Sequence, residues 1–561
     1  MKSREMQRFT LLTFVFALLA YISTEENDLI RDTQYGKIRG ELVRSAADPT
    51  VEFYSFKGVP YARPPTGQYR FKAPYSAKSW SGVRNTTESA EKCVQIADNF
   101  NGKGVVGSED CLYLEIFEPK TARERENQHG PLPVMVWIHG GTFIFGTARS
   151  TGSDYLMQKP VVVVTLQYRV NVFGFLSTED SYAQGNHGLK DQLHALKWVQ
   201  ANIKHFGGDP NKVTIFGESA GGASVLHHLI SKKSRGYFHR AISQSGSALN
   251  RWSFQFNPRE MAFKLGKHFG IETTSSKQLV EKLREIDYKE LQIAAFNKSV
   301  VGFYTPYYAQ PFAPSLEKKS DAAFLSESMF ESLEKGEYTK VPYMSGYNTE
   351  EGSFAYDYIV NRRANISMYE EHPELLVPNS MNISDDSPCI QEVIHKVKKF
   401  YFKDTNVTDP YNWIKFMSQD LFVRGIIKTM DLIYQSLPMY VYLFSYTGGQ
   451  PTSYFGGVGH YQEIQYLWYP KGPNDIPIES EEDKLTSRRL ITLWTNFAIT
   501  GNPTPKRDEL LQNIVWPQFD STKPYLVFDD NLSIAHNPNK EDTEFWNELY
   551  QKCGNPPYII Y

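Results

Sequence analysis

The sequence has no marked excess of charge of either sign. Its 60 lysines and arginines nearly balance its 63 aspartates and glutamates, so the net charge is −3 and the pI is near 6.5. Proteins that bind nucleic acid need a basic patch or stripe to neutralise phosphates. This balance gives no electrostatic case for such binding, and we expect no nucleic-acid partner.

Domain separators are also lacking. The 561 residues contain no linker rich in glycine, serine or proline, no block of like charge and no internal repeat. Length alone would suggest three or four domains at roughly 150 residues each. Without boundaries, one large domain with long insertions is the better interpretation, and we assign it to residues 24–561. Its 41% apolar content is sufficient for a sizeable core.

The apolar run near the N-terminus is short. Three basic residues precede residues 9–22, and two glutamates follow the run. A membrane span needs about 20 apolar residues. The pattern is typical of a secretory signal peptide, so we expect residues 1–23 to be removed and the protein to be secreted. An uncleaved anchor is the alternative. Residues 555–561 lack the apolar tail of a lipid-anchor signal, and we expect no stable membrane anchor.

Cysteine is scarce, with four residues in the chain. An even number can form two disulfides in an oxidising compartment. Cys93 and Cys111 are the favoured pair because they would close a short local loop. Cys389 with Cys553 follows only by elimination, and free thiols are the alternative. No spacing of cysteine or histidine is typical of a metal site, and we expect neither a metal nor an organic cofactor.

Sites for N-glycosylation agree with export. Asn-x-Ser/Thr sequences predict glycosylation at Asn85, Asn297, Asn365, Asn382, Asn406 and Asn531. Three of the six lie between residues 365 and 408. This polar stretch suggests an exposed insertion.

Continuous apolar runs recur along the chain, as expected for parallel strands that are buried on both faces. The runs cover residues 134–138, 161–166, 213–216, 241–244, 341–346 and 439–445. Helical patterns fall between several of them; in residues 188–206, apolar side chains recur every three or four positions. Strands that alternate with helices predict an α/β fold, with a large, mostly parallel central sheet and helices on both faces.

The apolar run at residues 213–216 leads into Gly217-Glu218-Ser219-Ala220-Gly221. A helical segment, residues 220–230, follows directly. A serine on such a tight strand-to-helix turn projects its hydroxyl above the sheet, and flanking glycines relieve crowding. The helix N-terminus offers free N–H groups to a developing negative charge. The order predicts a nucleophile elbow at Ser219. The alternative is a serine in a glycine-rich connection.

Reactive residue types also follow other strands, where ligands bind in parallel sheets. His139-Gly140-Gly141-Thr142 follows residues 134–138 and is placed as an oxyanion loop, although a glycine turn alone is the alternative. Glu350 and Glu351 follow residues 341–346, and a glycine-rich loop after residues 439–445 leads to His460. The order serine, acid, histidine is that of α/β-hydrolase triads. The residues alone leave open which glutamate is the acid.

The chain resembles type-B carboxylesterases, the cholinesterase-like family of α/β-hydrolases, and within it a secreted, insect-type esterase. The matching motifs are Phe56–Pro65, Glu109–Leu114, Asn186–Gln192, Phe206–Pro210, Phe216–Gly222, Gln244–Gly246, Trp494–Ala498 and Thr500–Thr504. The resemblance implies Glu351 as the triad acid. It also implies the Cys93–Cys111 bridge and the N–H groups of Gly141, Thr142 and Ala220 as oxyanion donors.

Four positions depart from related patterns. Thr142 stands where the family usually has the third glycine of the oxyanion loop, and its side chain would narrow the site or restrict φ. Glu115 replaces a customary asparagine. No tryptophan lies between Cys93 and Cys111, which argues against binding of choline esters by cation–π attraction. Glu218 stands where elbows that resemble those of insect juvenile hormone esterases have glutamine.

These observations predict a serine carboxylesterase that hydrolyses small, mainly apolar esters through an acyl-enzyme. Aromatic residues at Phe303-Tyr304 and Tyr307-Tyr308, near the expected acyl-side loop, suit an apolar pocket. The alternative is a cholinesterase-like binding or adhesion protein without activity. Such proteins have lost the serine or the histidine, whereas this sequence keeps all three triad residues.

Overall fold

The computed structural model describes residues 28–97, 104–122, 130–148, 151–301, 310–353, 356, 368–403, 406–448, 455–471 and 477–561. The expected signal peptide, Asn365 and the aromatic pairs between residues 303 and 308 lie outside the described residues.

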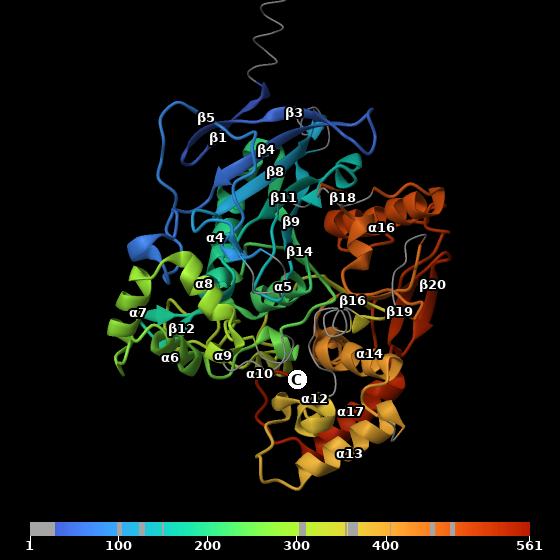
Figure 1. Cartoon of the computed structure of the whole chain (residues 1–561). Helices are drawn as coiled ribbons and strands as arrows, with labels where there is room; N and C mark the ends of the chain where they lie inside the picture. Colours follow the sequence, from blue (N-terminus) through green and yellow to red (C-terminus); the bar gives the residue numbers. More distant parts are fainter. Residues whose placement is uncertain are drawn as a thin grey trace, which may run out of the picture.

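An 11-stranded sheet organises the molecule (Figure 1), in the order β20-β19-β17-β16-β15-β14-β9-β11-β8-β4-β3. The seven strands from β19 to β11 in this order pair in parallel, while β20, β8, β4 and β3 pair antiparallel at the two edges. The parallel strands are β9 (Leu132–Ile138), β11 (Val162–Leu166), β14 (Gly208–Glu218), β15 (Arg240–Gln244), β16 (Tyr343–Asn348), β17 (Met439–Phe444) and β19 (Pro524–Phe528). The edge strands are β3 (Glu41–Arg44), β4 (Glu52–Pro60), β8 (Tyr113–Pro119) and β20 (Ser533–His536). The predicted α/β class and mostly parallel sheet are confirmed.

The central strands are buried on both faces, which explains their continuous apolar sequence. In β9, Val134, Val136 and Ile138 join one core, whereas Met135 and Trp137 join the other. Helices α4 (His187–Asn202) and α5 (Ala220–Ile230) contribute to the first core, and α16 (Glu481–Thr500) contributes to the second. The two cores fix the sheet between layers of helices, so the strand ends form a rigid platform.

Two groups of helices extend from the sheet and appear in the lower half of Figure 1. One follows β15 and comprises α6 (Pro258–His268), α7 (Ser276–Glu285), α8 (Tyr288–Phe296) and α9 (Lys298–Val301). The other comprises α12 (Met368–Glu371), α13 (Cys389–Phe402), α14 (Pro410–Ser418), α15 (Arg424–Ile433) and α17 (Lys540–Cys553).

The stretch from 365 to 408 is more structured than its polar composition suggests. Its described part contains α13, whose apolar residues at helical spacing, such as Val393, Val397 and Tyr401, are buried. The polar residues occupy the opposite face of the helix, so a polar sequence still packs. Asn382 and Asn406 are exposed, as are Asn85, Asn297 and Asn531.

Two disulfides join the four cysteines. Cys93 and Cys111 are bonded at an S–S distance of 2.05 Å, and Cys389 and Cys553 link α13 to α17. None of the helices in the described ranges is both long enough and apolar enough to cross a membrane.

Candidate active site

Ser219 stands on a sharp turn between β14 and α5. Its backbone has φ 57° and ψ −120°, a conformation that costs energy for a residue other than glycine. The turn is fixed on both sides, because the Ser219 N–H donates to Gln244 O (2.8 Å) and Ser219 O accepts from Ala223 N–H (2.8 Å). A side chain at Gly217 would approach Ile138 O to 2.5 Å. Strand β9 therefore packs against the elbow so closely that only glycine fits at this position.

The structure brings Glu351, rather than Glu350, to His460. The Oε2 atom of Glu351 lies 2.6 Å from His460 Nδ1. Its other oxygen accepts from Ser245 Oγ (2.5 Å) and from the Asn348 N–H (2.7 Å). The Glu351 carboxylate is fully buried and held at both oxygens, which orients the imidazole and favours the tautomer with a proton on Nδ1.

Glu350 holds the loop that carries His460. Its N–H donates to Val458 O (2.7 Å), and its Oε1 accepts from the Gly457 N–H (3.0 Å). The two adjacent glutamates therefore have different roles. Glu351 orients the imidazole, and Glu350 fixes the backbone of the loop that carries it.

Two further buried carboxylates, Glu218 and Glu463, lie beside the histidine. Oε1 of Glu218 is 3.1 Å from His460 Nε2, and Glu463 accepts from Asn348 Nδ2 (2.7 Å) and Gln244 Nε2 (3.2 Å). Burial raises the pKa of Glu218 well above its usual value, and the charges of Glu463 and Glu351 add to the rise, whereas the positive charge of protonated His460 opposes it and favours the Glu218 carboxylate. Burial and the Glu351 charge raise the pKa of Glu463 to about 7.

The carboxylates raise the basicity of His460. Burial alone would lower the pKa of His460, but the charges of Glu218 and Glu351 outweigh it and raise the pKa to about 9. Sequence reasoning did not identify Glu218 and Glu463 as part of the site. Both glutamates lie close in sequence to predicted site residues: Glu218 directly precedes Ser219, and Glu463 follows His460 by three residues.

An aromatic ring covers the imidazole. Phe422 lies in η8 (Gln419–Val423), a π-helical turn between α14 and α15, and its ring centroid is 4.3 Å from that of His460. The turn is held from the loop after β15: Asn250 Nδ2 donates to Phe422 O (2.8 Å) and Trp252 Nε1 donates to Leu421 O (2.7 Å). These side chains satisfy carbonyls in the π-turn, a type of helix irregularity frequent at functional sites.

The loop after β9 passes directly over the serine. A Cβ on Gly140 would lie 3.1 Å from Ser219 Cβ and 2.7 Å from Glu218 O. Thr142 and Phe143 both have positive φ, 50° and 62°; for the β-branched threonine this conformation costs roughly 1–2 kcal/mol. No described residue accepts a hydrogen bond from the N–H groups of Gly141, Thr142 or Ala220.

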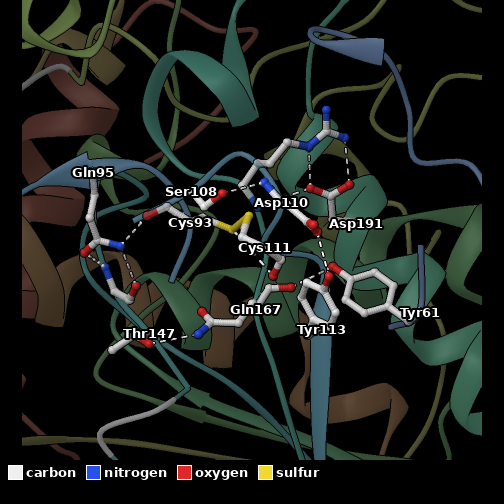
Figure 2. Close-up of a disulfide and its surroundings, with 12 residues drawn as sticks. Tyr61, Cys93, Gln95, Ser108, Asp110, Cys111, Tyr113, Thr147, Gln167 and Asp191 are labelled. Carbon is white, nitrogen blue, oxygen red and sulfur yellow. Dashed lines mark hydrogen bonds and ion pairs between the residues drawn. A yellow bond between two sulfur atoms is a disulfide. The ribbon is translucent and has the colours of Figure 1, made fainter. Parts of the chain in front are cut away.

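The disulfide loop supports the oxyanion loop from outside (Figure 2). Gln95, two residues from Cys93, forms two hydrogen bonds with Gly146: its Nε2 donates to Gly146 O (2.9 Å) and its Oε1 accepts from the Gly146 N–H (3.1 Å). Gln167 Nε2 donates to Thr147 Oγ1 (2.9 Å). The Cys93–Cys111 bridge therefore anchors the strand β6 (Gln95–Ile96) that fixes the far end of the loop.

His139, at the start of the loop, is a structural histidine. Its ring stacks on Tyr168 at a centroid distance of 4.2 Å, and Tyr168 donates its hydroxyl proton to His139 O (2.9 Å). Burial lowers the pKa of His139 to about 4, so the ring is neutral. His372, His395 and His536 are exposed. Among the described histidines, His460 has both a buried carboxylate on Nδ1 and a place beside the elbow.

The sequence profile of the carboxylesterase family matches residues 27–546. The chain belongs to the carboxylesterase family. It is 35% identical over 541 residues to juvenile hormone esterase of Tribolium castaneum, covering 91% of this chain and 89% of the relative. It is 32% identical to venom carboxylesterase-6 of Apis mellifera, covering 96% and 98% of the two chains.

The fold is shared with a solved structure of the family. The crystal structure of juvenile hormone esterase from Manduca sexta, with OTFP covalently attached, superposes with a TM-score of 0.81 at 27% identity. The match covers 93% of this chain and 99% of the other. The carboxylesterase described here is thus an α/β-hydrolase that acts on carboxylic esters, which are small-molecule substrates.

Proposed function

We propose that this carboxylesterase works through a Ser219–Glu351–His460 triad and an acyl-enzyme intermediate. The observation that carries the proposal is the 2.6 Å contact between Glu351 and His460 Nδ1, which lies beside the strained elbow at Ser219. The covalent OTFP in the Manduca sexta relative fits a nucleophile in the shared fold.

In the first step His460 Nε2 takes the Ser219 proton as Oγ attacks the ester carbonyl, and Glu351 stabilises the imidazolium. The N–H groups of Gly141, Thr142 and Ala220 hold the oxyanion; loss of one such donor typically costs about 3 kcal/mol of the barrier. His460 then protonates the leaving alkoxide. In the second step water, activated by His460, releases the acid from Ser219.

We propose mainly apolar esters as substrates and secretion as the location. Relatives of this chain include proteins named juvenile hormone esterase and acylcarnitine hydrolase, which supports ester hydrolysis as the reaction. Glu218 differs from the glutamine of elbows resembling those of insect juvenile hormone esterases, which favours a general carboxylesterase over a hormone-specific one. The N-terminal signal pattern and the five exposed sequon asparagines support passage through the secretory pathway.

Replacement of the nucleophile tests the proposed triad. We expect Ser219→Ala to abolish hydrolysis of short p-nitrophenyl esters while the thermal midpoint stays near that of the wild type, because the hydroxyl removed is small. Ser253→Ala serves as a control that removes a buried hydroxyl bonded to Ala248 O and Asn250 O. Hydrolysis by Ser219→Ala at the wild-type rate would contradict the assignment.

A further inference from the structure

Thr142 carries a buried hydroxyl at the position where the carboxylesterase family usually has glycine. The residue is 4% exposed, and its Oγ1 has no hydrogen-bond partner among the described residues. Such a hydroxyl has lost its hydrogen bonds to water without replacement, which disfavours folding. Because buried polar groups in native proteins are nearly always paired, an unpaired one requires an explanation.

The backbone of Thr142 adds a second cost. Its φ of 50° lies in the left-handed region, which β-branched residues rarely adopt. Glycine would relieve the strain and remove the unpaired hydroxyl at once. Strained residues of this kind cluster at functional sites, where the strain is part of the mechanism. Threonine at this position is therefore unfavourable for stability on two independent grounds.

The neighbours of Thr142 place the loop that carries it beside Ser219. Gly140 packs against Ser219, so the loop contacts the elbow. The Phe143 side chain is fully buried against Phe175 and Trp252, at centroid distances of 5.2 and 6.3 Å. In this part of the loop Thr142 alone offers a side-chain hydroxyl, and the same residue carries one of the three N–H groups that lack an acceptor among the described residues.

We propose that the Thr142 hydroxyl is a fourth hydrogen-bond donor for the oxyanion. It donates from Oγ1 to the ester carbonyl oxygen as that oxygen becomes negatively charged, and it keeps its proton throughout. This role rests on the proposed triad mechanism. A donor that is unpaired before the reaction and paired in the transition state lowers the barrier to the chemical step and so raises kcat.

The competing explanation is steric: the Thr142 side chain only narrows the site. Four variants separate the two. Thr142→Val keeps the shape and the β-branch but removes the hydroxyl, Thr142→Ser keeps the hydroxyl, and Thr142→Gly and Thr142→Ala remove both the hydroxyl and the branch. The measurements are kcat and KM for a short p-nitrophenyl ester, with the thermal midpoint of each variant.

We expect Thr142→Val to lose on the order of 10- to 100-fold in kcat, less than the loss of a sole side-chain donor. Its thermal midpoint should equal or exceed that of the wild type, because an unpaired buried hydroxyl is gone. Thr142→Ser should retain kcat to within a few-fold. In Thr142→Ala and Thr142→Gly, kcat should fall as it does in Thr142→Val. If Thr142→Val folds poorly, the comparison of Thr142→Ser with Thr142→Ala repeats the test, because these two variants differ only in the hydroxyl.

Thr165→Val is the matched control. Thr165 lies in β11, is fully buried and also has an Oγ1 without a partner among the described residues. Its replacement should change stability in the same direction as Thr142→Val but leave kcat at the wild-type value.

Wild-type kcat in Thr142→Val, or a Thr142→Gly variant faster than wild type, would overturn the hydroxyl role. Either result would leave the triad standing as long as Ser219→Ala is inactive. If Ser219→Ala retains activity, the proposed function itself fails, whatever the Thr142 variants show.

Discussion

Glu218 places a carboxylate at Nε2 of His460, the nitrogen that we propose takes the serine proton. Its Oε1 lies 3.1 Å from His460 Nε2, while Glu351 occupies Nδ1 at 2.6 Å. Two carboxylates on one imidazole favour its protonated form. In the proposed mechanism this preference stabilises the imidazolium that forms during serine attack. It also means that less neutral His460 is present at lower pH. The same contact therefore assists the reaction and sets its pH range.

Glu218→Gln should move the pH dependence. The reaction needs neutral His460, whose pKa is raised to about 9, so kcat/KM should rise with pH as His460 loses its proton. Removing the Glu218 charge lowers the pKa of His460, and we expect the rising limb to shift by about 1 unit to lower pH. The check is kcat/KM between pH 5 and 10 for both proteins. An unmoved limb, or a shift to higher pH, would contradict this account.

The sequence identifies residues at the site when they follow a recognisable pattern. Ser219 is predicted from a glycine-flanked turn, and His460 from its place after a strand and a glycine loop. Glu218 and Glu463 were not predicted because their importance comes from convergence on His460, which only the folded chain creates. The choice between Glu350 and Glu351 likewise depends on which carboxylate the turn after β16 directs to the imidazole, and the sequence supplied it only through resemblance.

At the scale of elements, the α14–η8–α15 unit supports both the proposed acid, Glu351, and the proposed base, His460. Ser418 Oγ, at the end of α14, accepts from the Gly352 N–H (2.8 Å), next to Glu351. Four residues later Phe422 covers His460. Asp420, in the same π-turn, is fully buried at its side chain and pairs with Arg251 and Arg424 at 2.7 and 3.0 Å. These contacts fix the π-turn to the rest of the molecule.

We expect Phe422→Leu to lower kcat through the position of His460 rather than through loss of stability. Leucine fills less of the space beside His460 and frees the imidazole to leave its position, and small misplacements of catalytic groups can cost up to about 100-fold in rate. We expect kcat to fall about 10-fold with a smaller change in KM. The measurement is steady-state kinetics on a p-nitrophenyl ester, paired with thermal unfolding.

Phe416→Leu provides the comparison for Phe422. Phe416 is equally buried in α14 but packs on Tyr401 and Phe402. It should lose similar stability and keep its kcat. Equal kcat losses in the two variants would show that Phe422 acts only through general packing of the helices.

At the scale of the whole molecule, the parallel sheet was predictable because its strands are buried on both faces and read as unbroken apolar runs. The predicted runs correspond to β9, β11, β14, β15, β16 and β17. Strand β19 was not predicted, because its buried residues alternate with half-buried ones near the edge of the sheet. The helical packing of residues 368–403 was also missed, since polar side chains on the outer face of α13 dominate its composition.

The fold converges on one point: four strands, far apart in sequence, lead into the segments that meet around Ser219. Strand β9 leads into the proposed oxyanion loop, β14 into Ser219, β16 into the proposed acid and β17 into the loop that carries the proposed base. The disulfide loop and the π-turn hold that assembly from outside. A nucleophile activated by this arrangement should react with a fluorophosphonate, whereas other serines of the chain should not.

The most direct measurement is to label the intact protein with a fluorophosphonate probe and to map the adduct by peptide mass spectrometry. We expect one adduct, on Ser219, formed in parallel with loss of esterase activity. We also expect His460→Ala to slow labelling by several orders of magnitude, because the serine then has no base. An adduct on another residue, or full loss of activity with Ser219 unmodified, would contradict the account.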